Sequence, residues 1–413
     1  MLTEKEKLDS LTLLGIELSR ISDLDILMEH VLTRARQFAN ADAGSIYIRQ
    51  GDWLHFSYTQ NETLQKKLPT GEKLIYSTFK VPIDEKSLAG YVALTGRPLN
   101  IEDVYNLPPT LPYSFRKQID DKVGYRTSSI LTIPLRNSSG NILGILQIIN
   151  ARETSGDITT FSESDERIMH HFAAVAAVAL ERAQMTRALI LRMISMAQMR
   201  DPRETGAHVN RVAGFAVEIY EEWAVRRGLE RKVIDKTRDV LRMAAMLHDV
   251  GKVATSDLIL RKPARLSADE YEVMKEHTIQ GARLFLQKQS DFDEAAAIVA
   301  LNHHERWDGT GYPGHVDFRT GLPLPGHILP DGRPQGKKAL EIPLFGRIVA
   351  LADVFDALSS KRSYKDPWDE REILSQIEKS AGTHFDPEVV EIFFNRYEVL
   401  CSIRGRYRED ETR

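Results

Sequence analysis

Residues 163–200 contain neither glycine nor proline and are rich in alanine, leucine, methionine, glutamate and arginine. This composition predicts one uninterrupted helix, because the strongest helix breakers are missing and the residues present have high helix propensity. At about 1.5 Å per residue, the helix would be on the order of 55 Å long. A helix of that length extends past any single small domain, so it divides the chain into a part before it and a part after it.

The part before the helix, residues 1–160, has the pattern of an α+β domain. Helical spacing in LDILMEHVLTRARQFAN gives way to four strand-like stretches, which are AGSIYIRQ, WLHFSYTQ, SSILTIPLRN and NILGILQIIN. Residues 137–140, Asn-Ser-Ser-Gly, supply turn residues between the last two stretches and predict a β-hairpin. Ser162 is the expected N-cap of the long helix, and Asp165 and Glu166 suit its positive end.

The part after the helix, residues 201–407, predicts an all-α helical bundle. Asp201 and Pro202 end the long helix. Apolar spacing with a period of about 3.6 recurs in DVLRMAAMLHDVGK, SADEYEVMKEHTIQGARLFLQ, DEAAAIVALNHHE, FGRIVALADVFDALSS and DEREILSQIEKSAG. The pattern fails in residues 315–338, which are dense in glycine and proline and predict a long irregular loop.

The connecting segment, residues 161–200, carries an apolar stripe along the predicted helix. Its members alternate four and three residues apart, and they are Phe172, Ala176, Ala179, Ala183, Thr186, Ile190, Met193 and Ala197. This spacing is typical of the seam of a two-stranded coiled coil and predicts a parallel homodimer. The alternative is a stripe that packs on its own chain.

Composition excludes several classes of protein. The net charge of −4 over 413 residues gives no reason to expect nucleic-acid binding. The single cysteine, Cys401, rules out an internal disulfide framework. The start MLTEKEKLDS lacks the pattern of a signal peptide, and the apolar run FAAVAAVAL is far shorter than the roughly 20 residues of a membrane span. We therefore expect a cytoplasmic protein that does not enter a membrane.

Histidine and carboxylate side chains in the helical part point to bound metal. Glu204 and His208 are four residues apart, so on a helix they share one face. Asp353 lies within VALADVFDAL, where burying an unpaired carboxylate is costly unless a cation offsets that cost. The full set of candidate ligands is Glu204, His208, His248, Asp249, His277, His303, His304 and Asp353. Any one histidine alone has an ordinary structural explanation, but eight ligands exceed the needs of one ion and predict a multinuclear site.

The same residues resemble a known family. His208, the pair His248-Asp249 and Asp353 are similar to the H…HD…D signature of the HD superfamily of metal-dependent phosphohydrolases. Together with HDVGK, HHERWDGTGYP and RSYK, they make residues 200–400 resemble the HD-GYP family, whose members hydrolyse cyclic di-GMP. The resemblance implies an HD-type helical bundle and a cyclic di-GMP phosphodiesterase.

The resemblance also implies roles for single residues. Asp249 would bridge metal ions as part of the catalytic centre, and His303 and His304 would bind different ions. Lys252 would act catalytically on a substrate phosphate, and Tyr312 would belong to the substrate-binding loop that gives the family its name. Two further residues, Arg362 and Lys365, would hold the phosphates.

The metal ions define the expected chemistry. A hydroxide that bridges two metal ions about 3.5–4 Å apart is a nucleophile at neutral pH, and the ions neutralise charge on the phosphodiester. In-line attack on phosphorus would open the cyclic dinucleotide to linear pGpG. A second hydrolysis to GMP is a further possibility that the sequence does not decide. Two or three divalent ions fit, and Glu204, four residues before His208, favours three. The family favours iron, while manganese, zinc, nickel and cobalt remain compatible.

Alternatives to this interpretation concern activity and partners. The protein could be a catalytically silent receptor of cyclic di-GMP that recruits other signalling proteins through the Gly-Tyr-Pro loop. It could also hydrolyse another cyclic dinucleotide, although Arg362, Tyr364 and Lys365 argue against that. The loop of residues 315–338 departs from the family, in which few residues follow Gly-Tyr-Pro, and is expected to be a lid, a partner-binding flap or an inert insertion.

Residues 1–160 resemble a GAF domain, a sensory module of many signalling proteins. The resemblance rests on the strand pattern, LHFSYTQN and the hairpin IPLRNSSGNILGILQIIN. Some members that bind cyclic nucleotides carry Asn-Lys and then Phe-x3-Asp-Glu, which Asn150, Phe161, Asp165 and Glu166 match here. The lysine is replaced by Ala151, so the ligand stays unknown, and a GAF domain that only dimerises is the alternative. In either case the domain is expected to regulate the phosphodiesterase.

Overall fold

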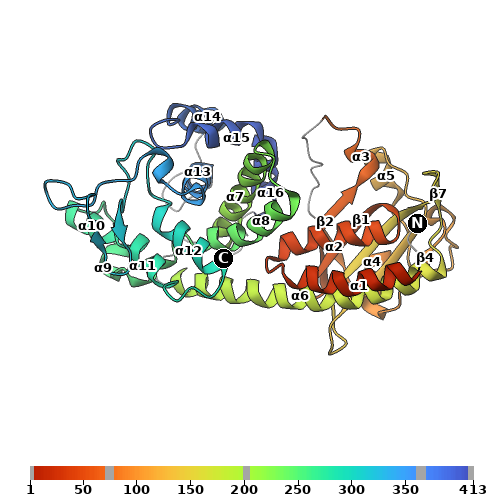
Figure 1. Ribbon diagram of the computed structural model, residues 1–413. Helices are drawn as coiled ribbons and strands as arrows, with labels where there is room; N and C mark the ends of the chain where they lie inside the picture. Colours follow the sequence, from red (N-terminus) through yellow and green to blue (C-terminus); the bar gives the residue numbers. More distant parts are fainter. Residues whose placement is uncertain (1–3, 70–78, 199–204, 360–368, 408–413) are drawn as a thin grey trace. The chain divides into compact units, whose positions relative to one another are not determined.

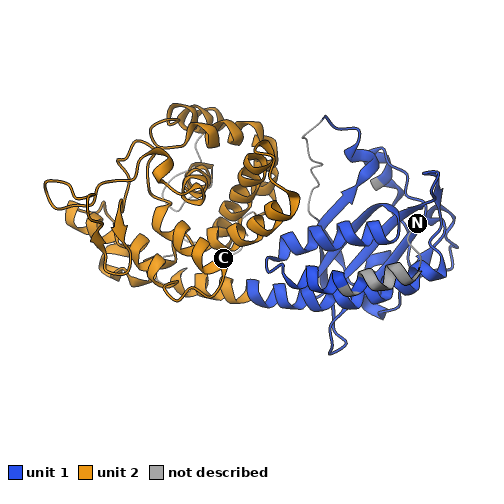
Figure 2. Cartoon of the chain, in the orientation of Figure 1, with its two compact units in different colours: residues 1–187 blue, residues 188–413 orange. Residues whose placement is uncertain are grey.

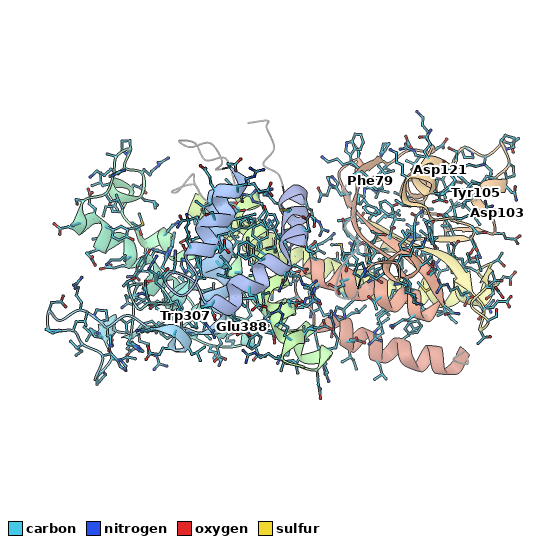
Figure 3. All side chains as sticks on the ribbon, turned by 90° about the horizontal axis from the view of Figure 1, so that it is seen from above. Phe79, Asp103, Tyr105, Asp121, Trp307 and Glu388 are labelled. Carbon is cyan, nitrogen blue, oxygen red and sulfur yellow. The ribbon has the colours of Figure 1, made fainter. Side chains whose placement is uncertain are left out.

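A computed structural model of the chain describes residues 4–69, 79–198, 205–359 and 369–407. The chain forms two compact units, Met1–Arg187 and Ala188–Arg413 (Figure 2). Side chains fill the interior of each unit (Figure 3). The predicted residues Glu204, Arg362 and Lys365, with Tyr364, lie outside the described residues. No helix in the described ranges combines the length and the apolar character that crossing a membrane requires.

Unit 1 is built on an antiparallel sheet with the strand order β3-β2-β1-β6-β5-β4, and β7 pairs with β6 (Figure 1). Its strands are β1 (Ala41–Gln50), β2 (Trp53–Asn61), β3 (Lys80–Pro82), β4 (Leu99–Ile101), β5 (Ile130–Arg136), β6 (Ile142–Arg152) and β7 (Ile158–Thr159). The predicted hairpin between β5 and β6 is confirmed, because Asn137 N–H donates to Asn141 O across the turn. Gly140 completes the turn at φ 83°, a value that favours glycine.

Helices cover this sheet and supply its largest core. They are α1 (Glu4–Ser19), α2 (Leu24–Phe38), α3 (Glu62–Gln65), α4 (Leu88–Thr95), α5 (Lys117–Val123) and the start of α6 (Glu163–Gln198), with the 3-10 turn η1 (Val104–Asn106). Asp23 caps α2 by accepting hydrogen bonds from Asp25 N–H and Ile26 N–H. Buried side chains of α1, α2 and α6 form one cluster with the inner faces of β1, β5 and β6. The α+β fold expected of residues 1–160 is therefore confirmed.

The apolar stripe predicted as a dimer seam packs inside the chain. Helix α6 is uninterrupted over its 36 residues, as its composition predicts. Phe172, Ala176 and Ala183 are fully buried in the core that α1 and α2 share with the sheet. Ile190 is buried among residues of unit 2, including Val212. The seam prediction is therefore wrong for these residues, because helices of the same chain already cover them.

A different row of apolar side chains on α6 is exposed. Val178, Met185, Leu189 and Met196 are 64%, 67%, 50% and 58% exposed. They are spaced seven, four and seven residues apart, which also follows a heptad. The helix thus has one apolar face inside the chain and a second apolar face at the surface.

Unit 2 is a helical bundle, as predicted, with α7 (Gly206–Arg226) near its centre. Around it lie α8 (Arg231–Ala245), α9 (Asp257–Leu260), α10 (Ala268–Lys275), α11 (His277–Arg283), α12 (Asp291–Asn302), α13 (Leu344–Ser359), α14 (Glu370–Lys379), α15 (Pro387–Asn395), α16 (Tyr397–Arg406) and the 3-10 turns η2 (Val250–Ala254) and η3 (Ala339–Glu341) (Figure 1). Helix α7 contacts α8, α13, α15 and α16. Its buried face, with Phe215 at 0% exposure, joins these helices in one core.

The segment 315–338 contains two short paired strands, so the prediction of a wholly irregular loop is wrong. Its strands β8 (Val316–Asp317) and β9 (Leu322–Pro323) pair, and His315 N–H donates to Gln335 O near its two ends. Val316 is buried against Ala282 and Leu301 of α11 and α12, and Arg283 Nε donates to Phe318 O at 2.8 Å. Glycine and proline favour irregular structure in general, but here they make the tight turns between short pairings.

Candidate metal centre

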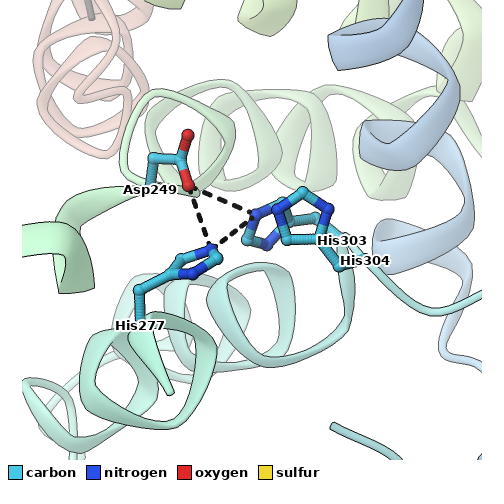
Figure 4. A group of neighbouring side chains, drawn as sticks. All are labelled: Asp249, His277, His303 and His304. Atoms are coloured by element: carbon cyan, nitrogen blue, oxygen red, sulfur yellow. Dashed lines mark hydrogen bonds and ion pairs between the residues drawn. The ribbon is translucent and has the colours of Figure 1, made fainter. Parts of the chain in front are cut away.

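Two groups of side chains in unit 2 have the arrangement of metal ligands. The first comprises Asp249, His277, His303 and His304, which converge on one point (Figure 4). The second comprises His208, His248 and Asp353. In each group, one candidate ligand atom per residue lies within 4.8 Å of the others. The structure therefore brings together seven of the eight predicted ligands, and Glu204 lies outside the described residues.

The first group is centred on Asp249, at the N-terminal boundary of η2. Asp249 Oδ1 lies 3.1 Å from His277 Nε2 and 3.5 Å from His303 Nε2, and these two nitrogens are 3.5 Å apart. His304 completes the group, with its ring centroid 4.1 Å from that of His303 and 5.1 Å from that of His277. Buried Asp249 Oδ1 accepts no hydrogen bond from the described residues when His277 and His303 carry their proton on Nδ1, as expected of an oxygen that binds a cation.

The second group is adjacent and shares Asp249 as a neighbour. His208 Nε2 lies 3.6 Å from Asp353 Oδ1, and His248 Nε2 lies 4.0 Å from the same oxygen. His248 Nε2 also lies 3.4 Å from Asp249 Oδ2. Asp249 therefore faces one group with each carboxylate oxygen.

Hydrogen bonds at the opposite ring nitrogen orient three of these histidines. His248 Nδ1 donates to Ala245 O at 2.9 Å, and His277 Nδ1 donates to Met274 O at 2.7 Å. His303 Nδ1 lies 3.1 and 3.0 Å from the carbonyl oxygens of Val299 and Ala300. A carbonyl oxygen only accepts, so Nδ1 carries the proton and Nε2 keeps the lone pair that a metal ion needs.

His208 is oriented in the same way by a carboxylate that the sequence analysis did not select. Its Nδ1 donates to Asp356 Oδ2 at 2.8 Å, and Arg211 holds both oxygens of Asp356, with Nε at 2.5 Å and Nη2 at 2.8 Å. Burial raises the pKa of Asp356, but Arg211 and His208 outweigh burial and lower it. The carboxylate of Asp356 is therefore ionised. The sequence contains a signal for this residue, because Asp356 follows Asp353 by three residues in the same apolar segment.

The protonation states also suit cation binding. Burial raises the pKa of Asp249, but the Lys252 ammonium and His248 hold it well below its usual range. Burial lowers the pKa of His303, and burial with the neighbouring His303 and His277 lowers that of His304 far below its usual value. At neutral pH the site thus offers a carboxylate and neutral imidazoles, the forms that bind divalent cations.

Glycines allow the elements of the site to approach one another closely. A Cβ added to Gly251, just after Asp249, would lie 1.9 Å from His277 O and 2.3 Å from Gly281 N. Only glycine permits this contact between η2 and α11, and the contact brings Asp249 within reach of His277. A Cβ on Gly346 would lie 2.6 Å from Asn302 Cβ, so α13 and the end of α12 also meet at a glycine.

The residues after His304 fold back over the site. Tyr312 N–H donates to His304 O at 3.2 Å, and the Tyr312 ring centroid lies 4.8 Å from that of His304. Glu305 Oε1 accepts from Gly314 N–H at 2.6 Å, and burial raises the pKa of Glu305 to about 7. Lys252 Nζ lies 2.5 Å from Asp249 Oδ2. Tyr312 and Lys252 are therefore both close to the candidate ligands, as predicted.

His384 is a further residue near the site that sequence reasoning missed. Its carbonyl oxygen accepts from Trp307 N–H at 3.1 Å, so it fixes the start of the Gly-Tyr-Pro segment. Burial and the nearby Arg306 lower the pKa of His384 to about 4. No metal ligand is adjacent to it in sequence, and only the fold places it here.

The residues of unit 1 that matched the cyclic-nucleotide pattern have structural partners. Asn150 Nδ2 donates to Tyr125 Oη and Arg126 O, and its Oδ1 accepts from Ser128 N–H. Phe161 is buried in the core, and Asp165 accepts from Ser162 N–H at the start of α6. The match therefore reflects how β6 connects to α6.

Comparison with known proteins assigns a family to each unit. Residues 23–180 match the family model of the GAF domain, and residues 205–358 match that of the HD domain. A second HD domain model matches residues 331–389.

Curated relatives are similar over the helical unit. A 3'3'-cGAMP-specific phosphodiesterase 2 of Vibrio cholerae is 38% identical over 203 residues, which are 49% of this chain and 33% of that protein. A cyclic di-GMP phosphodiesterase of Thermotoga maritima is 34% identical over 223 residues, 54% of this chain and 53% of that protein. The cyclic di-GMP phosphodiesterase response regulator RpfG of Xanthomonas campestris is 39% identical over 168 residues, 41% of this chain and 39% of that protein.

The chain thus spans about a third to a half of the length of these relatives. The expected resemblances, to the HD superfamily and to GAF domains, are both confirmed. Residues 23–180 therefore match a GAF domain and residues 205–358 an HD domain, in agreement with the resemblance to GAF and HD-GYP proteins.

Proposed function

We propose that the protein is a metal-dependent phosphodiesterase that hydrolyses cyclic di-GMP to pGpG. The observation that carries the proposal is the convergence of imidazole Nε2 atoms on Asp249 and Asp353, with each oriented Nδ1 held by a hydrogen bond. Relatives named cyclic di-GMP phosphodiesterase support the choice of substrate. Chromatography of the reaction products measures whether GMP forms in a second step.

Divalent cations fit the donor set. Neutral imidazoles and carboxylates suit iron, manganese, zinc, nickel or cobalt, and iron is our choice. When bound, such ions would supply a nucleophilic water and neutralise charge on the phosphodiester. The chain would hold the ions in two neighbouring groups, with Asp249 in the first group and its Oδ2 3.4 Å from His248 Nε2 of the second.

Two described side chains are proposed to bind the phosphates. The ammonium of Lys252 lies beside Asp249. A substrate phosphate bound to the same metal ions would place a negatively charged oxygen there, and the ammonium would neutralise part of that charge. Tyr312 lies beside His304 and would line the substrate site. Arg362 and Lys365 retain the phosphate-binding role that the resemblance implies.

A second candidate substrate has a specific observation in its favour. One relative at 38% identity is named a 3'3'-cGAMP-specific phosphodiesterase. Both substrates contain a guanine and the same 3',5'-phosphodiester ring, so the metal centre treats them alike. The difference between them lies in the base-binding part of the site.

Purified protein supplied with Fe(II) or Mn(II) is expected to convert cyclic di-GMP to pGpG. Chromatography of the products, with 3'3'-cGAMP as a parallel substrate, measures which nucleotide is cleaved and whether GMP follows. Asp249→Asn is expected to abolish turnover, because both ligand groups lose their shared carboxylate. Tight binding of cyclic di-GMP without any cleavage by the metal-loaded protein would instead identify a silent receptor.

Asp356→Asn is expected to lower metal affinity or turnover about 10–100-fold, because His208 loses the carboxylate that fixes its tautomer. Metal titration with a competing chelator measures the affinity. The matched control is Asp386→Asn, which breaks another buried ion pair, with Arg347, without touching a candidate ligand. Equal losses of metal affinity in the two variants would mean that Asp356 stabilises the fold and has no specific effect on His208.

The number of ions is tested through Glu204, which we propose as a ligand of a third ion. Glu204→Gln, purified anaerobically with excess Fe(II) or Mn(II), is expected to hold one ion fewer per chain than the wild type. The remaining ions keep Asp249, Asp353 and the histidines. Elemental analysis gives the count, and an identical metal content in the two proteins would contradict a three-metal site.

We further propose that the protein is a homodimer in the cytoplasm and that its GAF domain regulates the HD domain. The exposed row on α6, Val178, Met185, Leu189 and Met196, has the heptad spacing of a seam between two parallel helices. This row replaces the stripe first predicted, because Phe172, Ala176, Ala183 and Ile190 of that stripe are buried within the chain. Recruitment of other signalling proteins through the Gly-Tyr-Pro loop remains part of the proposal.

The double variant Met185→Glu with Leu189→Glu is expected to be monomeric, because four like charges would face one another in the seam. Light scattering measures the mass, and circular dichroism checks that both units stay folded. Ser195→Glu, an exposed position outside the row, is the control and should keep the mass of the wild type. A dimer that survives the double variant would place the contact elsewhere.

A further inference from the structure

Helix α10 presents an aromatic and a cationic side chain beside the Gly-Tyr-Pro segment. The ring of Tyr271 lies edge-on to that of Tyr312, with centroids 6.3 Å apart at an interplanar angle of 80°. Lys275 Nζ lies 5.6 Å from the Tyr271 centroid and 5.7 Å from the Tyr312 centroid. Two tyrosine rings and one ammonium thus form a continuous surface that begins at the metal ligand His304.

This surface is held in place by its own helix. Ser267 and Glu270 form a capping box at the start of α10, and Lys262 pairs with Glu270. Tyr271 and Lys275 are four residues apart, so they share one face of the helix. Tyr271 remains 48% exposed although its ring contacts that of Tyr312, so part of the Tyr271 ring faces solvent.

Among the described residues, Lys275 pairs with the carboxylate of Glu272, which is itself at the surface. Its Nζ lies 2.6 Å from Glu272 Oε2, and the Glu272 side chain is 58% exposed. The Lys275 side chain is only 22% exposed. An ammonium carries three donors, so the pair with Glu272 leaves donors that can reach a ligand placed over Tyr271.

We propose that Tyr271 and Lys275 bind one guanine base of the cyclic dinucleotide, and that Lys275 makes this position selective for guanine over adenine. The inference rests on the proposed function, since it takes the phosphate to be at the metal centre. An aromatic ring stacks on any base. Guanine offers two acceptors, O6 and N7, to a lysine, whereas adenine offers N7 and places a donor beside it. The ring of Tyr271 therefore supplies affinity and the ammonium of Lys275 supplies selectivity.

Steady-state kinetics with cyclic di-GMP, 3'3'-cGAMP and cyclic di-AMP test this assignment. Tyr271→Ala is expected to raise KM for cyclic di-GMP about tenfold with kcat nearly unchanged, whereas Tyr271→Phe keeps the ring and the KM of the wild type. Lys275→Met is expected to reduce the preference for cyclic di-GMP over cyclic di-AMP about tenfold. The control Lys288→Met breaks a surface ion pair with Glu294, outside α10, and should leave the preference intact.

A substrate without bases separates base binding from damage to the metal centre. All four variants should cleave bis(p-nitrophenyl) phosphate at the wild-type rate and hold wild-type amounts of metal. Unchanged KM in Tyr271→Ala together with unchanged preference in Lys275→Met would overturn the inference while the phosphodiesterase activity stands. If the wild type cleaves no cyclic dinucleotide, the proposed function fails, and calorimetry of cyclic di-GMP binding then tests the surface alone. Equal affinity of Tyr271→Ala and wild type in that measurement would overturn it.

Discussion

The hydrogen bond from imidazole Nδ1 to an acceptor on the chain is the interaction on which the metal centre depends. In His248, His277 and His303 the acceptor is a backbone carbonyl three or four residues earlier, so the local helical backbone fixes both the tautomer and the direction of Nε2. Asp356 does the same for His208 across two helices. Without these bonds, Nε2 would have no reason to face Asp249, and the two ligand groups would not share a carboxylate.

Close packing between helices supports this arrangement of the candidate ligands. Gly251 lets η2 approach α11 to a distance that a Cβ would forbid, and Gly346 does so for α13 and the end of α12. Phe215 of α7 and Phe355 of α13 pack with centroids 5.0 Å apart in the core of unit 2, and the same two helices carry His208 and Asp353. The polar site is therefore held by an apolar core, which explains how several charged groups stay buried in a helical bundle.

In two segments the sequence pattern is real, but it does not identify the part of the chain against which the segment packs. The heptad of α6 that includes Phe172 and Ala183 is satisfied by α1 and α2 of the same chain, while the row that includes Met185 stays exposed. The glycines and prolines of residues 315–338 make turns between short pairings, and Val316 and Phe318 dock on α11 and α12. In both cases the partner comes from a distant part of the chain, and local spacing does not identify it.

Local sequence patterns were enough to predict the helical and strand-rich regions, the uninterrupted α6, the order of the two domains and the seven candidate ligands that the structure brings together. These depend on local properties, because helix period, turn residues and the HD and Gly-Tyr-Pro motifs are all contained in short stretches. Only the tertiary structure decided that Asp356 and Arg211 orient His208, that His384 lies near the centre, and that Tyr271 and Lys275 stand beside Tyr312. Those contacts join residues from separate elements of the fold. Local patterns did not reveal them because a side chain's partner across a packed core has no fixed separation in sequence.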